Sequence, residues 1–279
     1  MEKLQAAIEK ARERRAAIAA AAPPKAKGKL NDDGVETEAD VIETTPSTWD
    51  AIAMHEVPVR TARRNRLYFQ SNSLEAGYYD RLRTKVLQQC RDNGWKRIAV
   101  TSATKGCGKT TTCANLAASF TRQRDRSMIL FDMDMRRPEL ARTLGFKAEA
   151  GFAEVLEGKA RFEEAALRLS ANVACSPNAR ANPNPALLML QDRTPELLNE
   201  IEARYQPDLM VFDTPPILST DDTVAMLKYV DCAIIIAAAE TTTTKHVDEC
   251  EKELAEQTNI LGVILNKCKY FDEAQSYYY

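Results

Sequence analysis

The chain has 279 residues, of which 44% are hydrophobic, and its formal net charge is -2. This composition is typical of a globular protein with a full-sized core. A sequence pI near 5.9 provides no overall positive field, which disfavours a nucleic-acid-binding role. Seven scattered cysteines without C-x-x-C spacing argue against a disulfide framework or a zinc site and favour a reducing compartment.

Residues 1–60 are predicted to form a flexible arm with a short basic helix followed by an acidic linker. Residues 1–30 hold eight Lys or Arg against three acids, whereas residues 31–50 hold seven acids and no base. Such segregated charge is typical of a solvated segment, and a docking helix for a partner or an anionic membrane face is the alternative. The run from Cys232 to Ala239 is far shorter than the roughly 20 residues of a membrane span, so we expect a cytoplasmic protein that reaches the membrane through a partner.

Residues 61–269 are predicted to form one α/β domain. Apolar runs of strand length alternate there with stretches of helical periodicity, and most of the runs are too apolar to have one face in water. This pattern indicates a doubly wound, mostly parallel sheet with helices on both faces. The predicted strands cover residues 97–102, 127–132, 172–176, 208–213, 232–239 and 260–266, and the main predicted helices start at Lys109, Pro185 and Thr244.

A glycine-rich turn follows the first predicted core strand and opens a helix. It reads "ATKGCGKTT", which approaches G-x-x-x-x-G-K-[ST] except that Ala103 stands at the first glycine position. Glycines let backbone N–H groups point at phosphate oxygens, and the helix aims its positive end at the same place. We therefore expect Lys109 to reach the β and γ phosphates of a nucleotide and Thr110 to bind Mg²⁺.

Three aspartates follow predicted strands. Asp132 and Asp134 lie in "ILFDMDMRRP", and Asp213 ends "LMVFD". Because the carboxyl ends of parallel strands meet at the ligand crevice, we expect these carboxylates to converge on the phosphate loop. They can hold Mg²⁺, directly or through water, and accept the proton of an attacking hydroxyl.

These motifs together resemble the bacterial tyrosine kinases of capsule and exopolysaccharide export, relatives of the partition and septum-site ATPases. The resemblance covers residues 75–279 and includes the D-x-D-x-R-R-P string, the "VFDTPP" segment and the carboxyl end "YFDEAQSYYY". It implies an ATP-dependent protein-tyrosine autokinase that regulates polysaccharide synthesis and export. The alternative is a regulatory ATPase switch of the partition type, but its signature lysine is replaced here by Thr104.

The resemblance also implies roles for single residues. Lys109, Asp132 and Asp134 are the expected catalytic residues, with Asp132 as the base. Arg136 and Arg137 have two open interpretations, a contact with phosphate or a neighbouring subunit and simple solvation. The expected nucleotide-binding residues are Thr104, Lys105, Gly106, Cys107, Gly108, Lys109, Thr110, Thr111 and Asn266, with Asn266 at the adenine, and the expected ligands of Mg²⁺ are Thr110, Asp132, Asp134 and Asp213.

Residues 270–279 are predicted to be a tail that carries the phosphorylation sites, Tyr270, Tyr277, Tyr278 and Tyr279. The thirteen residues from Asn266 to Tyr279 span at most about 45 Å, which is enough to reach a neighbouring copy. Implied partners are the chain itself, a separate membrane-embedded regulator of polysaccharide chain length, and a tyrosine phosphatase. The family's ring-forming E-x-x-R-x-x-R helix is degraded here to Gly77, Asp80 and Arg83, so ring formation stays open.

Overall fold

The computed structural model describes residues 48–69 and 73–268, which belong to one compact unit that starts at Thr45. The predicted basic helix and the tyrosine tail lie outside the described residues. The first described element, the 3-10 helix η1 (Thr48–Ala51), buries Trp49, whose indole N–H donates to the Tyr205 carbonyl at 3.1 Å. Packed structure therefore begins before the predicted boundary at residue 60, because an aromatic anchor lies in the acidic stretch.

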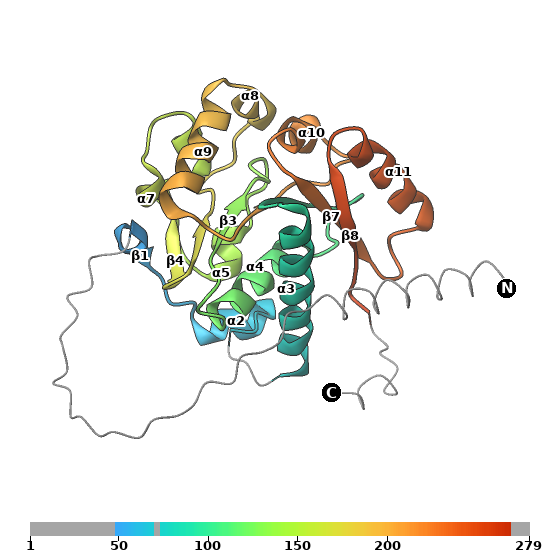
Figure 1. Cartoon of the computed structure of the whole chain (residues 1–279), viewed down its shortest axis with the longest axis horizontal. Coiled ribbons are helices and arrows are strands. Elements are labelled where there is room, and N and C mark those ends of the chain that lie inside the picture. Colours follow the sequence, from blue (N-terminus) through green and yellow to red (C-terminus); the bar gives the residue numbers. More distant parts are fainter. Residues whose placement is uncertain (1–47, 70–72, 269–279) are drawn as a thin grey trace, which may run out of the picture. The chain divides into compact units, whose positions relative to one another are not determined.

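An eight-stranded sheet forms the centre of the molecule (Figure 1). The strand order is β1-β4-β5-β3-β6-β2-β7-β8, and every neighbouring pair is parallel except β4 with β5. The predicted fold class is thus confirmed. The strands are β1 (Ala53–Met54), β2 (Arg97–Thr101), β3 (Met128–Asp132), β4 (Leu167–Ser170), β5 (Val173–Ser176), β6 (Leu209–Asp213), β7 (Cys232–Ala238) and β8 (Asn259–Asn266).

Helices cover both faces of the sheet because alternate side chains of each buried strand point to opposite faces. In β3, for example, Met128 and Leu130 pack under α3 and α4, whereas Ile129 and Phe131 pack on the other face with α6 to α9. The helices are α2 (Val59–Asn65), α3 (Leu74–Asn93), α4 (Lys109–Thr121), α5 (Leu140–Leu144), α6 (Phe152–Leu156), α7 (Phe162–Ala165), α8 (Pro185–Met189), α9 (Arg193–Tyr205), α10 (Asp221–Leu227) and α11 (Thr244–Ala255).

Two predicted elements differ from the observed ones. The helical stretch from Pro185 to Tyr205 is broken into α8 and α9, because Pro195 has no N–H to continue the helix and is accommodated in the first turn of α9. The strand predicted over residues 260–266 was expected to be buried, but β8 is an edge strand on which Val263 and Leu265 are 44% and 62% exposed. All seven cysteines are free thiols.

Candidate nucleotide site

The glycine-rich turn lies between β2 and α4, as its sequence predicted. Gly106 and Gly108 have φ angles of +76° and +92°, in the region that favours glycine, and Gly108 caps α4 directly before Lys109. A Cβ on Gly108 would come within 2.3 Å of the Asn266 side chain. Glycine is therefore required here both by the backbone conformation and by the close approach of β8.

Asn266 and Cys107 hold the turn from behind. The Asn266 amide donates to the Cys107 carbonyl at 2.9 Å, which places the predicted adenine-binding residue against the loop. The Cys107 thiol is buried and donates to the Thr104 carbonyl at 3.2 Å. Burial alone would raise the pKa of this thiol, but hydrogen bonds with Thr104, Thr242 and Ser102 outweigh burial and lower the pKa below its ordinary value.

The ammonium group of Lys109 lies inside the fold beside the loop. Its side chain is buried, and Nζ donates to the Ser102 hydroxyl at 3.1 Å. Ser102 in turn donates to the Thr104 carbonyl at 2.7 Å, so the lysine is oriented through the loop's own hydrogen bonds. An ammonium group held in this way is preorganised to bind an anion in front of the glycine-rich turn.

Asp132 and Asp213 are paired neighbours at the ends of β3 and β6. Both are 1% exposed, and three of their four carboxylate oxygens accept no hydrogen bond in the described part of the protein. The fourth, Asp132 Oδ2, accepts from the Leu140 N–H at 3.1 Å. Buried carboxylate oxygens without partners are costly, and a cation with its water shell would satisfy them.

Burial controls the protonation of both carboxyls. It raises the pKa of Asp132 well above its usual range, and the nearby Asp213 raises it further. Burial likewise raises the pKa of Asp213 to about 7, although Thr110 and Lys109 oppose the rise.

Asp134 differs from the other two aspartates because it is half-buried and lines the cavity in front of the loop. Its Oδ1 accepts from the Arg137 N–H at 3.3 Å. Burial raises its pKa, and Lys109 partly offsets the rise. The cavity has a volume of about 370 Å³, and the predicted residues among those that line it are Lys105, Gly106, Gly108, Lys109, Thr110, Thr111 and Asp134, with Arg137 beside them.

No group of three His, Cys, Asp or Glu side chains converges on a ready metal cage within residues 48–69 and 73–268. Mg²⁺ is commonly held by one or two carboxylates together with substrate phosphates and water. The predicted metal ligands are therefore brought to one end of the sheet, but they fit a cation that arrives with a nucleotide better than a resident ion.

Arg136 has a partner that sequence reasoning missed. It forms a two-point ion pair with Asp222 of α10, at 2.6 and 3.0 Å, and also donates to the Pro183 carbonyl at 2.8 Å. The Asp222 side chain is 3% exposed. This contact ties the loop that carries Asp134 to the segment after β6. Its partners are 86 positions apart in the chain, and no local pattern signals the pair.

The degraded ring motif on α3 forms contacts within the subunit. Asp80 accepts from Arg83 at 2.9 Å and from Arg122 at 2.6 Å, and Arg83 also donates to the Ser119 carbonyl. These side chains pack α3 against α4. Asp80 and Arg83 are thus already engaged inside the subunit.

The fold and the phosphate loop define the class of the protein as a P-loop nucleotide-binding protein of the α/β type. The family model of the CobQ/CobB/MinD/ParA nucleotide binding domain matches residues 98–278. The chain therefore belongs to this family. Within the described part of the chain, we found no helix with the length and apolarity needed to cross a bilayer.

Relatives confirm the resemblance to bacterial tyrosine kinases. The chain is 29% identical over 212 residues to the tyrosine-protein kinase YwqD of Bacillus subtilis, which covers 75% of this chain and 88% of that protein. It is also 29% identical over 255 residues to the tyrosine-protein kinase wzc of Salmonella typhi, covering 85% of this chain but only 35% of the longer relative. The VpsO kinase domain superposes with a TM-score of 0.62 and 29% identity, covering 70% of this chain and 96% of that domain. These relatives favour the kinase over the partition-type switch.

Proposed function

We propose that the protein is an ATP-dependent tyrosine kinase that phosphorylates Tyr270, Tyr277, Tyr278 and Tyr279 of neighbouring copies. The observation that carries this proposal is the arrangement of Lys109, Thr110 and Asp134 around one cavity in front of the glycine turn. Such an arrangement suits phosphoryl transfer, which needs mainly positioning and charge stabilisation. Relatives named as tyrosine kinases support the same assignment.

The adenine is proposed to lie in a second, adjoining cavity of about 320 Å³. Its lining includes Tyr68, Tyr79 and Asn266, and Lys267 lines both this cavity and the phosphate-loop cavity. The Tyr68 and Tyr79 rings are stacked with centroids 6.2 Å apart, and they offer an aromatic wall to a flat base. The two cavities together would hold the base and the phosphates of ATP on either side of Lys267.

In the transfer step, the loop amides and Lys109 hold the β and γ phosphates, and Thr110 and Asp213 fit Mg²⁺, which neutralises phosphate charge when bound. A tyrosine oxygen attacks the γ phosphorus as the bond to the β-phosphate oxygen breaks, leaving ADP. We propose that Asp134 accepts the phenolic proton, because it lines the cavity whereas the predicted base, Asp132, lies buried beneath it. Asp132 is then proposed to act as a further carboxylate for Mg²⁺, directly or through water.

The tail of a neighbouring copy is the proposed substrate, since its four tyrosines follow β8 within thirteen residues in the sequence. Each phosphotyrosine adds roughly -1.5 to -2 charges, so modification should drive the tail from a phosphate-filled site. A membrane-embedded regulator of polysaccharide chain length is the proposed activator, and it would bring the kinase to the inner face of the membrane. A tyrosine phosphatase would remove the phosphate groups from the tail.

The proposal is tested by incubating the protein with Mg-ATP and mapping modified residues by mass spectrometry. We expect phosphate on the tail tyrosines of the natural protein and a loss of at least 100-fold in rate in Lys109→Met, since a buried charge at the transferred phosphate is removed. The control is Lys147→Met, an exposed lysine that does not line the cavity, and it should retain the natural rate.

Transfer between copies is tested in the same assay. Lys109→Met protein with an intact tail is mixed with a copy whose four tail tyrosines are Phe. Phosphate on the Lys109→Met tail shows transfer between copies. Unmodified tails in the natural protein would contradict the kinase proposal, and equal modification of Lys109→Met alone would show that another site does the chemistry.

A further inference from the structure

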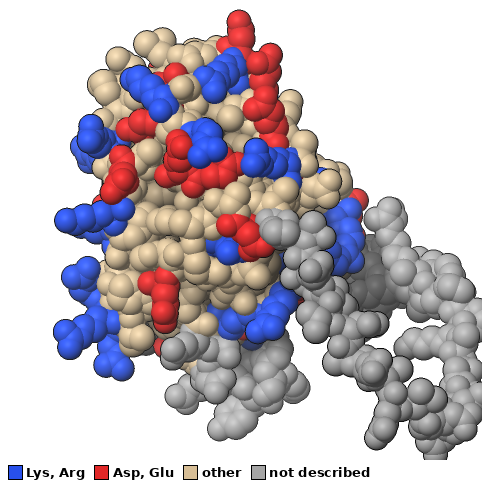
Figure 2. All heavy atoms as spheres, turned by 90° about the vertical axis from the view of Figure 1, so that its left-hand side faces the viewer, with Lys and Arg blue, Asp and Glu red and all other residues tan. Residues whose placement is uncertain are grey.

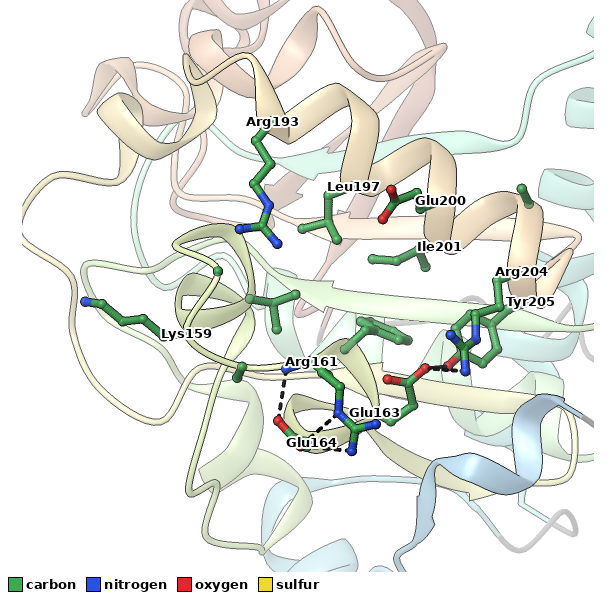
Figure 3. Close-up of a pocket in the computed structure, with 15 residues that line it drawn as sticks. Lys159, Arg161, Glu163, Glu164, Arg193, Leu197, Glu200, Ile201, Arg204 and Tyr205 are labelled. Atoms are coloured by element: carbon green, nitrogen blue, oxygen red, sulfur yellow. Dashed lines mark hydrogen bonds and ion pairs between the residues drawn. The ribbon is translucent and has the colours of Figure 1, made fainter.

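A larger cavity, which we call the α9 cavity, lies between α9 and the segment of α6 and α7 (Figure 3). Its volume is about 860 Å³, in the upper part of the range of roughly 300–1,000 Å³ typical of ligand pockets. None of the residues that line it also lines the phosphate-loop cavity. The proposed kinase chemistry therefore leaves this cavity without a role.

The inner wall of the α9 cavity is apolar and partly aromatic. Val155, Phe162, Leu197, Ile201 and Tyr205 all line it and are each less than 10% exposed. The rings of Phe162 and Tyr205 lie 5.3 Å apart at an angle of 55°. A further aromatic ring can pack on such a wall, because tilted aromatic pairs with this spacing are favourable.

Among the Lys and Arg residues that line the cavity, Arg193 is the one not paired with a carboxylate in the described part of the chain. It begins α9, is exposed, and has no acidic partner in the described part of the chain. Figure 3 shows its guanidinium reaching from the start of α9 towards the loop opposite. There it lies over Gly158, whose φ is +73° and where a Cβ would come within 2.0 Å of Arg193 Nη1. A glycine therefore makes room for the guanidinium.

Two other arginines of the rim are already neutralised. Arg161 pairs with Glu164, and Arg204 pairs with Glu163, each at 2.9 Å. Glu163 also accepts from the Tyr205 hydroxyl at 2.7 Å. On the face of the molecule shown in Figure 2, Lys and Arg are interspersed with Asp and Glu, so no large patch carries charge of one sign. Recognition at this cavity must therefore come from single side chains, with Arg193 as the one available fork.

Three carboxylates line the cavity, and Glu163 and Glu164 are already paired with Arg204 and Arg161, so Glu200 is the one that most opposes an anionic ligand. It is seven residues along α9 from Arg193, or about 10 Å at 1.5 Å per residue. An anion held by the Arg193 fork would therefore lie outside contact distance of Glu200. This separation gives the cavity a cationic end and an acidic end.

We propose that the α9 cavity binds a phosphotyrosine in residues 270–279 of a neighbouring copy. The aromatic wall suits the ring, and the planar Arg193 fork suits the phosphate, which it can bind through two parallel hydrogen bonds. The segment also has a suitable charge, because Asp272 and Glu273 lie in it and no Lys or Arg occurs from 271 to 279. The cavity would thus hold the product of the proposed reaction at a place separate from the catalytic loop.

The strand order favours a neighbouring copy as the source of this segment. The segment follows β8 at one edge of the sheet, whereas α7 leads into β4, six strand spacings or about 29 Å away. Tyr278 is ten residues beyond Cys268 and can extend at most about 36 Å from it. Its own chain would have to be almost fully stretched while passing around the helices.

The test uses the full chain with its four tail tyrosines replaced by Phe, so that no tail competes, and a fluorescent synthetic peptide of residues 269–279. Binding is measured by anisotropy without ATP, with the peptide phosphorylated at Tyr278 or unmodified. We expect the phosphopeptide to bind at least tenfold more tightly than the unmodified peptide. Arg193→Ala should remove that preference, Arg193→Lys should retain part of it, and Glu200→Gln should bind as tightly as the parent or more tightly.

Three outcomes would overturn the proposal. The first is equal phosphopeptide affinity in Arg193→Ala protein that has the parent's melting temperature. The second is displacement of the peptide by Mg-ADP, which would place it at the phosphate loop. The third is equally tight binding of an unrelated phosphotyrosine peptide with basic flanks. Because the peptide is synthetic, the result is independent of whether the protein proves to be a kinase.

Discussion

At the scale of single residues, the buried carboxylates of Asp132 and Asp213 are the least ordinary feature. Each was expected to lie at a strand end, and each does. Their depth could not be predicted, because it depends on α4 and α5 closing over the strand ends. Burial of two neighbouring carboxylates costs folding free energy, and a bound cation would relieve that cost.

The stability of the metal-free protein should depend on pH through Asp213. Its pKa is raised to about 7, so the folded protein keeps a proton that the unfolded chain loses near pH 4. The stabilising contribution of the protonated Asp213 to the free energy of unfolding is therefore lost as pH rises from about 4 to 7. Asp213→Asn should stabilise the metal-free protein, more at pH 8 than at pH 5, by no more than about 4 kcal/mol.

This expectation is checked by urea unfolding at both pH values, with the exposed Asp92→Asn as the matched control. An Asp213→Asn protein that is less stable at both pH values would mean that the amide does not fit the site. In that case the Asp213 carboxylate would have a stabilising partner other than Thr110 and Lys109.

At the scale of elements, the contact between α3 and α4 depends on one acid shared by two arginines. Arg83 and Arg122 have side chains 13% and 14% exposed, and each also donates to a backbone carbonyl. Asp80 therefore compensates two largely buried cations. The motif that resembles a subunit-assembly helix serves here to join two helices of one chain.

Replacing Asp80 by Ala should destabilise the protein by about 1–3 kcal/mol, because charged hydrogen bonds are lost and two guanidiniums are left without their acid. The measurement is the free energy of unfolding in urea. The control is Asp125→Ala, whose pair with Arg126 is 3.7 Å long and exposed, and which should cost less than about 0.5 kcal/mol. Equal effects of the two variants would contradict the role given to Asp80.

Some elements of the fold could be predicted from the sequence and others could not. Six strands were recognisable from their apolar runs, and in all of them except the edge strand β8 most side chains are buried. The two-residue β1 is too short to be recognised, and in β4 the polar Arg168 and Ser170 interrupt the apolar run. The glycine turn and the strand-end acids were predictable from local order, whereas the Arg136 to Asp222 pair and the α9 cavity arise from packing between distant segments.

At the scale of the whole molecule, the folded unit includes more of the amino-terminal region than the composition suggested. Trp49 and Ile52 lie in the same core cluster as Tyr205 and Phe162. The acidic composition of residues 31–50 hides Trp49 from any average taken over that stretch. The compact unit starts at Thr45, before both of these side chains.

Two truncations test this boundary. A chain that starts at Thr45 should unfold with the same free energy as the parent, because it retains the whole described core. A chain that starts at residue 61 should lose roughly 3–5 kcal/mol or more, since burial of Trp49 alone is of that order. Thermal and urea unfolding measure both, and equal stability of the two truncated chains would contradict the assigned core.

The two-point ion pair between Arg136 and Asp222 should constrain the evolution of both positions. A guanidinium held at two points by a nearly buried carboxylate leaves either residue difficult to exchange alone. Among homologous sequences, positions 136 and 222 should therefore vary jointly, with loss of the acid accompanied by loss of the arginine. Independent variation at the two positions would show that the two residues are not constrained together.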